Sequence, residues 1–447
     1  MEKKKLYIQT FGCQMNVQDA DKMASLLAPS GYGATDDPER ADLILINTCS
    51  IREKAEQKIY SQLGRFRALK QKNPHLLIGV GGCLAQQWGG RLFGRAPFVD
   101  LVFGTHQIHR LPEMVGELER DRGRIVETGF CDRVQSLSIP AQPEEGAVST
   151  FVTIMQGCNN FCAYCVVPHL RGREESRPPA EILREVEMLA GRGIREVTLL
   201  GQNVNSYGKT LPGEADFAEL IGAIGEVPGI ERIRFTTSHP KDLSPRLMAC
   251  FGAVGSLCEH IHLPVQSGSD RVLHRMNRGY DVAAYREKVA ALRRACPEIS
   301  ITSDVIVGFP GEEESDFEQT LGLMREIRFD NLFSFQYSER AGTAAAGMDG
   351  AVAEGIKRER LMTLQALQAE HTWEKNRACV GRLEEVLVEG PSRNEAGEMT
   401  GRTRGNRIVN FPGETGWIGK IVSVRIVGAF LHSLRGEREE RGGGDVH

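Results

Sequence analysis

Three cysteines near the middle of the chain, Cys158, Cys162 and Cys165, are spaced Cys-x3-Cys-x2-Cys. They follow an apolar segment at 151–155, which we expect to be a strand, and the turn residue Gly157. Three thiolates from one loop can hold three irons of a 4Fe–4S cluster, which normally takes four cysteines. The fourth iron would then keep an open position, and an open position is where metal chemistry takes place.

Two plainer interpretations of this motif remain open. A structural zinc site would need a fourth ligand, and His169 is near enough in the sequence to provide one. A disulfide would fit a small secreted protein better than a chain of 447 residues with an ordinary composition. The rest of the chain must decide among the three.

Three further cysteines, Cys13, Cys49 and Cys83, occur once in each of three successive strand–helix units. Each lies just past the end of an expected strand; these strands are at 6–10, 43–46 and 76–80. Open α/β sheets gather their ligands at the carboxyl ends of parallel strands, so the three thiolates could meet at one rim. Small buried core cysteines are the alternative, but these would fall within the strands. We therefore predict a second three-cysteine cluster with its own open iron.

The composition is that of an ordinary soluble protein, with 41% hydrophobic and 26% charged residues. No apolar run reaches about 18 residues, so we expect no transmembrane helix and no membrane. The basic start, residues 1–5, lacks the apolar core of a signal peptide, which predicts a cytoplasmic location where cysteines stay reduced. The net charge of −4 gives no sign of nucleic acid, so any such surface must be local.

Strand and helix patterns divide the chain into three predicted domains, and the fold class is α/β. Residues 4–120 are expected to form an open, parallel α/β domain, and 121–147 the connection that follows it. Residues 144–376 contain about six strand–helix units, which predicts a full or partial β/α barrel. Residues 377–440 hold β-rich segments separated by glycine, proline and asparagine, which predicts a small all-β barrel.

Polar and glycine-rich segments follow the strands of the predicted central barrel, for example Gly201–Asn203 and Gly308–Glu312. This pattern places a site on the face where the strands end. His239 and His262 are expected to be structural rather than catalytic, and no catalytic acid or base is assigned.

The C-terminal barrel carries Arg402, Arg404 and Arg407 on its middle segment, beside Asn406 and Asn410. A basic face on a small barrel suits the phosphate backbone of RNA. A solvated surface is the alternative, since acidic residues almost balance the charge of this domain. We take the three arginines as the RNA-binding candidates.

In the order of these domains and in the residues of five motifs, the chain resembles the methylthiotransferases, a family of radical S-adenosylmethionine (SAM) enzymes. The resemblance runs from about residue 5 to residue 436; the motifs are Thr10–Asn16, Asn47–Glu53, Gly157–Cys162, Leu200–Tyr207 and Thr236–Pro240. It implies that the C-terminal barrel is a TRAM-like RNA-binding domain and the central one a partial β/α barrel. It also implies two 4Fe–4S clusters, one that cleaves SAM and one that presents or supplies sulfur; their ligands would be Cys158, Cys162 and Cys165, and Cys13, Cys49 and Cys83, respectively.

Within this family the motifs resemble the members that add a methylthio group to C2 of N6-isopentenyladenosine next to the anticodon of tRNA. The implied cofactors are SAM and two 4Fe–4S clusters, and the implied partners are tRNA, a reductant such as flavodoxin or ferredoxin, and a sulfur donor; we expect a monomer. Related members modify threonylcarbamoyl adenosine in tRNA or an aspartate of a ribosomal protein. An iron–sulfur RNA-binding sensor without turnover is an alternative of another class.

The resemblance also indicates which side chains hold SAM. The candidates follow the strands of the barrel: Gln202, Asn203, Gln266, Ser267, Asp304, Gly308, Gly311 and Glu312. Two departures from the family pattern are visible, Asn159 in place of aspartate and His169-Leu170 in place of Tyr-Thr. Neither is an expected cluster ligand, so they bear on substrate detail and not on the type of reaction.

Overall fold

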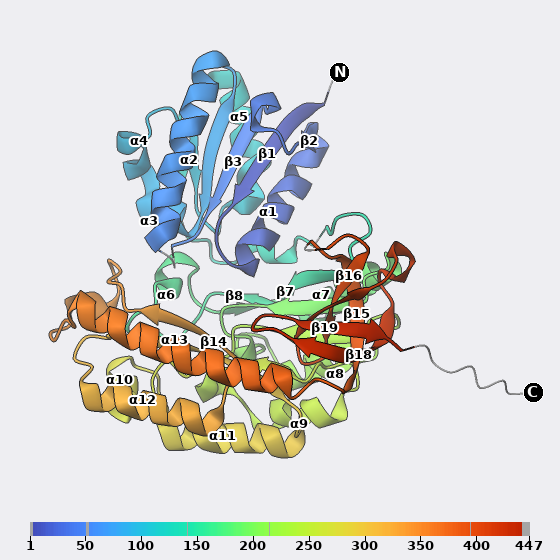
Figure 1. Ribbon diagram of the computed structural model, residues 1–447. Helices are drawn as coiled ribbons and strands as arrows, with labels where there is room; N and C mark the ends of the chain where they lie inside the picture. Colours follow the sequence, from blue (N-terminus) through green and yellow to red (C-terminus); the bar gives the residue numbers. More distant parts are fainter. Residues whose placement is uncertain (1–2, 51–52, 141, 214, 394, 440–447) are drawn as a thin grey trace, which may run out of the picture.

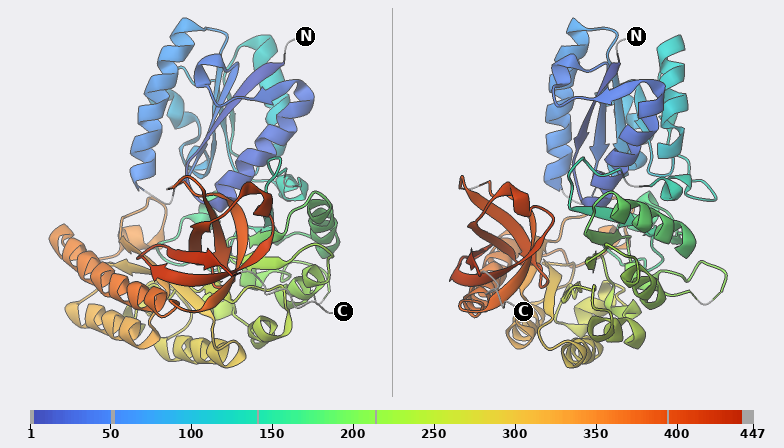
Figure 2. Two further views of the ribbon diagram at one scale, coloured as in Figure 1. Left: turned by 45° about the vertical axis from the view of Figure 1, so that its right-hand side comes forward. Right: turned by 90° about the vertical axis from the view of Figure 1, so that its right-hand side faces the viewer.

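The computed structural model describes residues 3–50, 53–140, 142–213, 215–393 and 395–439. The chain forms three units: an N-terminal sheet above a central set of strands and helices, and a small barrel at the side of the central unit (Figure 1, Figure 2). The predicted fold class, α/β with a C-terminal all-β barrel, is confirmed. No helix among the described residues has the length and apolar character needed to span a membrane.

The N-terminal unit is a parallel sheet with the strand order β2-β1-β3-β4-β5-β6. Its strands are β1 (Lys4–Thr10), β2 (Tyr32–Ala34), β3 (Leu43–Thr48), β4 (Leu77–Gly82), β5 (Leu101–Phe103) and β6 (Ile125–Glu127). Apolar residues of the central β3 are buried against helices on both faces, as in other doubly wound sheets. One face is covered by α1 (Gln14–Leu27) and α5 (Leu111–Asp121), and the other by α2 (Glu53–Lys72), α3 (Cys83–Trp88) and α4 (Leu92–Arg95).

Two strands of this sheet, β2 and β6, were not expected from the sequence. Each has three residues at an edge of the sheet, which is too short for a readable period-two pattern. β6 lies within 121–147, so this segment is more than a connection: it pairs with β5 and extends the sheet.

The central unit is an open barrel made of two parallel sheets, β7-β10-β11 and β12-β13-β14, which approach each other at a bridge between Ile233 and Leu257. The strands are β7 (Ser149–Thr153), β10 (Glu196–Leu200), β11 (Arg232–Phe235), β12 (His260–His262), β13 (Ser300–Val307) and β14 (Asn331–Gln336). The outer helices are α7 (Pro179–Gly191), α8 (Phe217–Gly225), α9 (Pro245–Ala253), α10 (Asp270–Arg275), α11 (Val282–Ala295), α12 (Glu314–Ile327) and α13 (Glu354–Arg377). Among the described strands β7 and β14 do not pair, so the barrel is partial.

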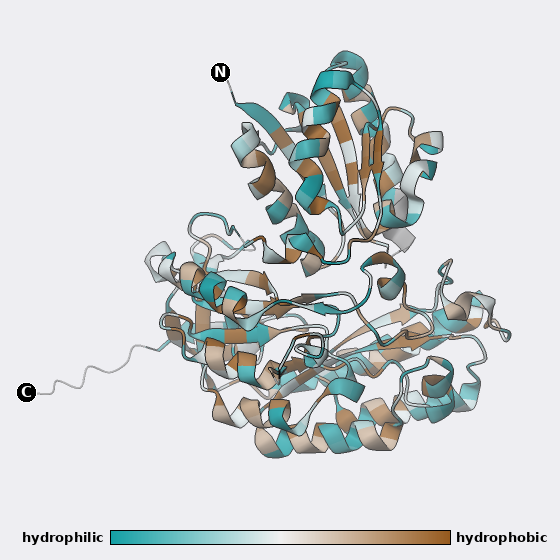
Figure 3. Ribbon diagram, turned by 180° about the vertical axis from the view of Figure 1, so that it is seen from behind, coloured by the Kyte–Doolittle hydropathy of each residue, from teal (hydrophilic) through white to brown (hydrophobic). Residues whose placement is uncertain are grey.

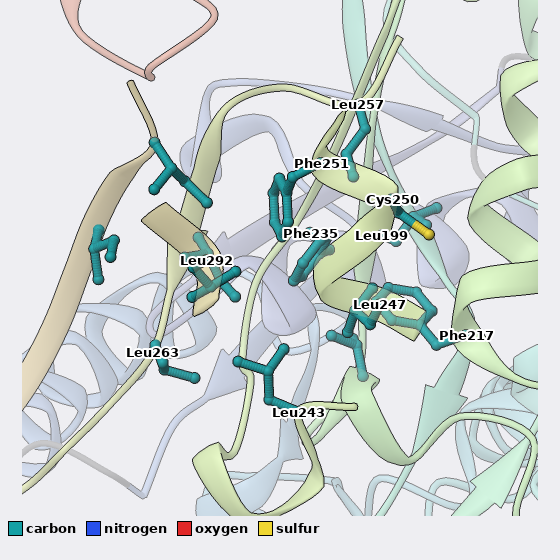
Figure 4. Packing of buried hydrophobic residues seen from close by; sticks show 14 of the residues in the cluster. Leu199, Phe217, Phe235, Leu243, Leu247, Cys250, Phe251, Leu257, Leu263 and Leu292 are labelled. Carbon is teal, nitrogen blue, oxygen red and sulfur yellow. The ribbon is translucent and has the colours of Figure 1, made fainter. Parts of the chain in front are cut away.

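The main core lies between these strands and the helices outside them. Phe235 of β11 meets Phe217 of α8 edge-on at 5.1 Å between ring centroids, and Phe251 of α9 lies 5.9 Å away on its other side (Figure 4). Burying each such ring stabilises the fold by about 1.5–3 kcal/mol. The helices carry both hydrophilic and hydrophobic residues, whereas the strands of the N-terminal sheet are mostly hydrophobic (Figure 3). In α7, for example, Ile182, Val186 and Leu189 are buried in the main core.

The C-terminal unit is a closed barrel with the order β15-β16-β17-β19-β18. Its strands are β15 (Leu383–Pro391), β16 (Glu398–Thr403), β17 (Ile408–Pro412), β18 (Ile421–Ala429) and β19 (Leu434–Arg438). The middle β-rich segment predicted for this domain is two strands, β16 and β17, because the chain turns at Asn406, which has a positive φ of 67°. Arginine-rich β19 was not expected; it closes the barrel by pairing with β17 and β18.

Candidate functional site

The loop with the central cysteines connects β8 (Met155–Gln156) to α6 (Val167–Leu170), and glycine sets its entry. Gly157 has φ +80°, and a Cβ there would lie 2.0 Å from the carbonyl oxygen of Arg173. Its N–H donates to Oε1 of Gln202 at 2.6 Å, and the N–H of Cys158 donates to the oxygen of Gly172 at 3.2 Å. Only glycine permits this close approach, which fixes the start of the loop.

Cys162 accepts two hydrogen bonds from buried side chains. Nη1 of Arg278 lies 3.3 Å from its Sγ, and Nε2 of His239 lies 3.6 Å away. Burial, and then the charge of Arg278, lower the pKa of His239 to about 2, so this ring is neutral. Its Nδ1 accepts from the N–H of Lys241 at 3.2 Å, which leaves the proton on Nε2 to be donated to the sulfur. Hydrogen bonds to a ligating sulfur help to set the reduction potential of an iron–sulfur cluster.

Asp242 fastens the cysteine loop to the end of β10. Its carboxylate accepts from Nδ2 of Asn160 at 3.1 Å, Nδ2 of Asn203 at 2.8 Å and Nζ of Lys209 at 2.6 Å. Burial alone would raise the pKa of Asp242, but these hydrogen bonds outweigh it and lower the pKa to about 2. The sequence analysis missed Asp242, although it lies only two residues beyond the motif that ends at Pro240.

The three N-terminal cysteines lie where predicted, at the carboxyl edge of the parallel sheet. Cys13 precedes α1, Cys49 follows β3, and Cys83 is the first residue of α3. The backbone of Gly12, next to Cys13, lies close to Cys49: a Cβ added to Gly12 would be 3.2 Å from the Sγ of Cys49. Cys13 and Cys83 also interact electrostatically, so the sheet gathers the three thiols into one rim.

The two groups of cysteines face each other across the domain junction. Val166 and Leu170, just after Cys165, form a small buried cluster with Cys83. Arg171 then reaches into the N-terminal unit, where it forms a buried ion pair of 2.7 Å with Asp19 and donates a hydrogen bond to Oδ1 of Asn16 at 3.4 Å. Cutting one partner from such a pair typically costs 3–5 kcal/mol, so Arg171 helps to hold the two rims in register.

The cysteines fit iron–sulfur clusters better than a single ion. Within the part of the chain that is described, no three histidine, cysteine, aspartate or glutamate side chains converge closely enough to hold one metal ion. Zinc needs its ligands at about 2.0–2.3 Å from one centre, whereas the thiolates of a cluster bind different irons and stand further apart. His169, the potential fourth zinc ligand, is exposed. Burial raises the pKa of Cys158 to about 11 and that of Cys165 to about 12, so metal binding must displace their protons.

A polar cofactor fits beside the central loop. Four buried polar atoms at the ends of β10, β11 and β12 have no hydrogen-bond partner among the described residues: Oδ1 of Asn203, Oγ1 of Thr236, Oγ of Ser238 and Oε1 of Gln266. Buried polar groups are normally paired, so unpaired ones near a cysteine loop indicate a ligand. Asn203 and Gln266 were predicted to contact SAM, and Thr236 and Ser238 were not.

The structure gives the other predicted SAM contacts internal partners. Ser267 bonds to Thr320, Asp304 pairs with His262, and Gln202 holds the Gly157 turn. The Gly308–Glu312 turn packs against α13; its bonds are Gly308 N–H to Glu312 at 2.8 Å, Gly311 N–H to Gly350 at 2.6 Å and Arg360 to Glu312 at 2.7 Å. The Glu312 carboxylate therefore stabilises this turn.

The three arginines predicted to bind RNA all take part in ion pairs among the described residues, and their role in RNA binding remains a prediction. Arg404 pairs with Glu259 at 2.7 Å and Arg407 with Asp330 at 2.6 Å, and both carboxylates belong to the central unit. Arg402 pairs with Glu389 at 3.1 Å. Arg404 and Arg407 thus dock the barrel on the central unit, and the sequence could not reveal their carboxylate partners, which are 145 and 77 residues away.

A cavity of about 420 Å³ opens beside Cys49, where the N-terminal unit meets the loop after β14. Its lining includes Trp88, Arg91 and Arg340. The ring of Tyr60, which also lines the cavity, stacks on Trp88 at 5.0 Å. This size is typical of small-ligand sites, so the N-terminal rim is accessible from the domain junction.

Comparison with known proteins gives one match for each unit. The models of the Uncharacterized protein family UPF0004, the Radical SAM superfamily and the TRAM domain match residues 5–104, 152–324 and 377–438. The chain is 59% identical to the tRNA-2-methylthio-N(6)-dimethylallyladenosine synthase of Syntrophus aciditrophicus, over 98% of this chain and 95% of that protein. It is 55% identical to the synthase of the same name from Geobacter sulfurreducens, over 98% of each chain.

Among solved structures, the fold is similar to radical S-adenosylmethionine methyltransferase TsrM from Kitasatospora setae, with a TM-score of 0.58, 14% identity, and coverage of 87% of this chain and 79% of that one. The cobalamin-dependent S-adenosylmethionine radical enzyme OxsB gives a TM-score of 0.53 at 14% identity, over 83% of this chain and 56% of that one. At such identity these likenesses show a shared fold alone.

Proposed function

The chain belongs to the tRNA-2-methylthio-N(6)-dimethylallyladenosine synthases of the radical SAM superfamily, and we propose that it adds a methylthio group to C2 of N6-isopentenyladenosine next to the anticodon of tRNA. Relatives at 59% and 55% identity over nearly the whole chain support this activity. The matching TRAM domain supports tRNA as the partner.

The observation that carries the proposal is the opposition of two three-cysteine rims across one domain junction. We propose that Cys158, Cys162 and Cys165 hold one 4Fe–4S cluster and that Cys13, Cys49 and Cys83 hold the other. When bound, the clusters and SAM supply the electron, radical and group-transfer chemistry that side-chain acids and bases lack for a non-acidic aromatic C–H bond.

The residues of the chain hold and shield this chemistry. Arg278 and His239 donate to the sulfur of Cys162, and Asp242 fixes the cysteine loop. Asn203 and Gln266 offer unpaired carbonyl oxygens to the polar cofactor. The buried Val166 and Leu170 exclude water between the rims, which protects reactive groups.

The proposal includes three external requirements. A reductant such as flavodoxin or ferredoxin delivers electrons, a sulfur donor replaces the sulfur that leaves with each product, and tRNA is modified in the cytoplasm. We also propose that the protein acts as a monomer, since one chain supplies both cysteine rims.

Mass spectrometry of tRNA nucleosides tests the activity. Reconstituted protein with SAM, a reductant and a sulfur source should convert isopentenyladenosine in tRNA to its 2-methylthio form, and unmodified tRNA should react far less. Equal activity on tRNA with threonylcarbamoyl adenosine, or activity on a ribosomal protein, would contradict the assignment.

Iron content and SAM cleavage test the two rims separately. Anaerobically reconstituted protein should bind roughly eight irons, and alanine at all three cysteines of either rim should leave about four. Without Cys13, Cys49 and Cys83 the protein should still form 5′-deoxyadenosine but no methylthio product. 5′-Deoxyadenosine formed without Cys158, Cys162 and Cys165 would refute the assignment of the central loop.

A further inference from the structure

Two phenylalanines of β14 are exposed at a position where a closed barrel would bury them. Phe333 is 50% exposed and Phe335 40% exposed. Large apolar side chains scattered singly on a surface need no explanation, but a pair on one strand of an enzyme barrel marks a contact surface. What this surface contacts follows from its direction and its neighbours.

Both rings lie on the inner face of the partial barrel. The residues that alternate with them face outward: Leu332 belongs to the main core, and the hydroxyl of Ser334 accepts from Gln365 of α13 at 3.3 Å. Because side chains alternate along a strand, Phe333 and Phe335 point to the opposite side. They remain exposed because β14 is an edge strand of an open barrel.

The neighbouring strand completes this face with polar and apolar groups. Phe333 lies opposite Asp304 of β13, and Phe335 lies opposite Ile306. Nε2 of His262 lies 3.3 Å from Oδ1 of Asp304, and the His262 ring meets Phe333 edge-on at 6.0 Å. We call these five residues, His262, Asp304, Ile306, Phe333 and Phe335, the inner face.

The inner face leads directly to the central cysteine loop. Ile306 and Tyr164 both pack against the apolar cluster that contains Ala163, and Ala163 and Tyr164 lie between the second and third cysteines. Two residues after His262, the oxygen of Pro264 accepts from Arg278 at 2.7 Å, and Arg278 also contacts Cys162. A group bound on the inner face would therefore lie next to the radical SAM centre.

We propose that the inner face binds the N6-dimethylallyl adenosine of the tRNA and selects it over other modified adenosines. Phe333 and Phe335 contact the apolar dimethylallyl group and the purine, and Asp304, held by His262, accepts the one hydrogen that remains on N6. This inference rests on the proposed function and deepens it by assigning the residues that recognise the substrate. Aromatic side chains are common partners of single-stranded bases.

The same residues disfavour a threonylcarbamoyl group. That substituent ends in a carboxylate, which would lose water against two phenyl rings and would lie near the carboxylate of Asp304. An anion without a partner in an apolar setting is costly, and a like charge adds to the cost. Arg402 and Arg407 of the C-terminal barrel are already paired with Glu389 and Asp330.

The test compares the affinities of full-length reconstituted protein for three anticodon stem-loop RNAs, carrying dimethylallyl adenosine, adenosine or threonylcarbamoyl adenosine. Wild-type protein should prefer the dimethylallyl RNA. F333A and F335A should each lower its preference over the adenosine RNA about tenfold, since each removes part of the apolar contact. F430A, which removes a ring 56% exposed on the C-terminal barrel, should keep the ratio of the two affinities.

A complementary change tests the charge. D304N should raise the affinity for the threonylcarbamoyl RNA relative to the dimethylallyl RNA by about tenfold, because the repulsion is removed. Unchanged iron content and melting temperature exclude misfolding as the cause in each variant. If wild-type protein methylthiolates the dimethylallyl RNA and all three variants keep its preferences, this inference fails while the proposed function stands. If wild-type protein does not methylthiolate it, the proposed function itself fails.

Discussion

The two cysteine rims are built in different ways. The central rim comes from one loop of eight residues, Cys158 to Cys165, whose entry is set by Gly157. The N-terminal rim comes from three separate strand–helix units, and its cysteines at 13, 49 and 83 meet only when β1, β3 and β4 have paired. One rim is assembled by local chain geometry and the other by tertiary structure.

This difference teaches where each rim is vulnerable. Closing a short loop costs little more entropy once its turn is formed, whereas distant thiols depend on the whole sheet that aligns them. The N-terminal rim should therefore respond to backbone changes at its strand ends. The central rim should respond instead to the side chains that hold its loop, such as Asp242.

The largest effect is expected from G12A, which should disrupt the N-terminal rim and leave the central one intact. Gly12 has φ +132°, and an added Cβ would lie 2.6 Å from the Cβ of Cys49. We expect iron to fall from about eight to about four per chain, measured by iron analysis after reconstitution. The control is G31A, because Gly31 also has a positive φ, +88°, but has open space around an added methyl. Full iron in G12A would show that the rim tolerates distortion.

A smaller effect on the other rim is expected from D242A. The change removes the acceptor of Asn160, Asn203 and Lys209 and should lower the free energy of unfolding by about 2–3 kcal/mol. Iron should leave the central cluster faster when a chelator is added, which absorbance can follow in a variant that lacks Cys13, Cys49 and Cys83. E326A, which removes an exposed ion pair with Arg286, should change stability by less than about 1 kcal/mol. Equal rates of iron loss in the two variants would contradict the role of Asp242.

The smallest effect concerns the junction between the rims. Burial, with the charges of Glu144 and Asp19, raises the pKa of Asp21 to about 6. The folded state thus binds the proton more tightly than the unfolded state, and stability falls as pH rises from about 4 to about 6. D21N should remove this loss. It should raise the free energy of unfolding by about 1–2 kcal/mol at pH 7.5, after allowance for partial exposure, but by much less at pH 4.5. Melting temperatures of the variant and the wild-type protein at both pH values measure this effect. An equal increase in stability at both pH values would refute the raised pKa of Asp21.

The sequence predicted the three-part fold because the patterns behind it are local. Long buried strands such as β3 and β13 read clearly from their apolar residues, and the partial barrel followed from repeated strand–helix units. The short edge strands β2 and β6, and β19 with its charged residues, carry no such pattern. They become strands because a neighbouring strand offers hydrogen-bond partners. The residues of one segment do not show whether such a neighbour exists.

The same division holds for the chemistry of the site. The six cysteines were identifiable because spacing and position after strands are properties of the sequence, and their role as cluster ligands remains a prediction. Asp242, Arg171 and Arg278 were not identifiable, since each acts through partners elsewhere in the chain. The ion pairs of Arg404 and Arg407 were not predictable for the same reason: a charge pattern does not show whether a carboxylate lies beside it in the fold.

The sequence alone thus determined the type of reaction, because the spacing of metal ligands, the order of strands and the family motifs are all properties of the linear sequence. The choice of adenosine rested only on the resemblance of the family motifs, since nothing in the physical chemistry of those residues distinguishes a prenyl from a threonylcarbamoyl group. Only the tertiary structure turned Phe333 and Phe335 to the open inner face and set Asp304 between them and His262. Recognition of the substrate depends on which side chains lie on the same surface, and the pairing of strands that are distant in the sequence determines which ones do.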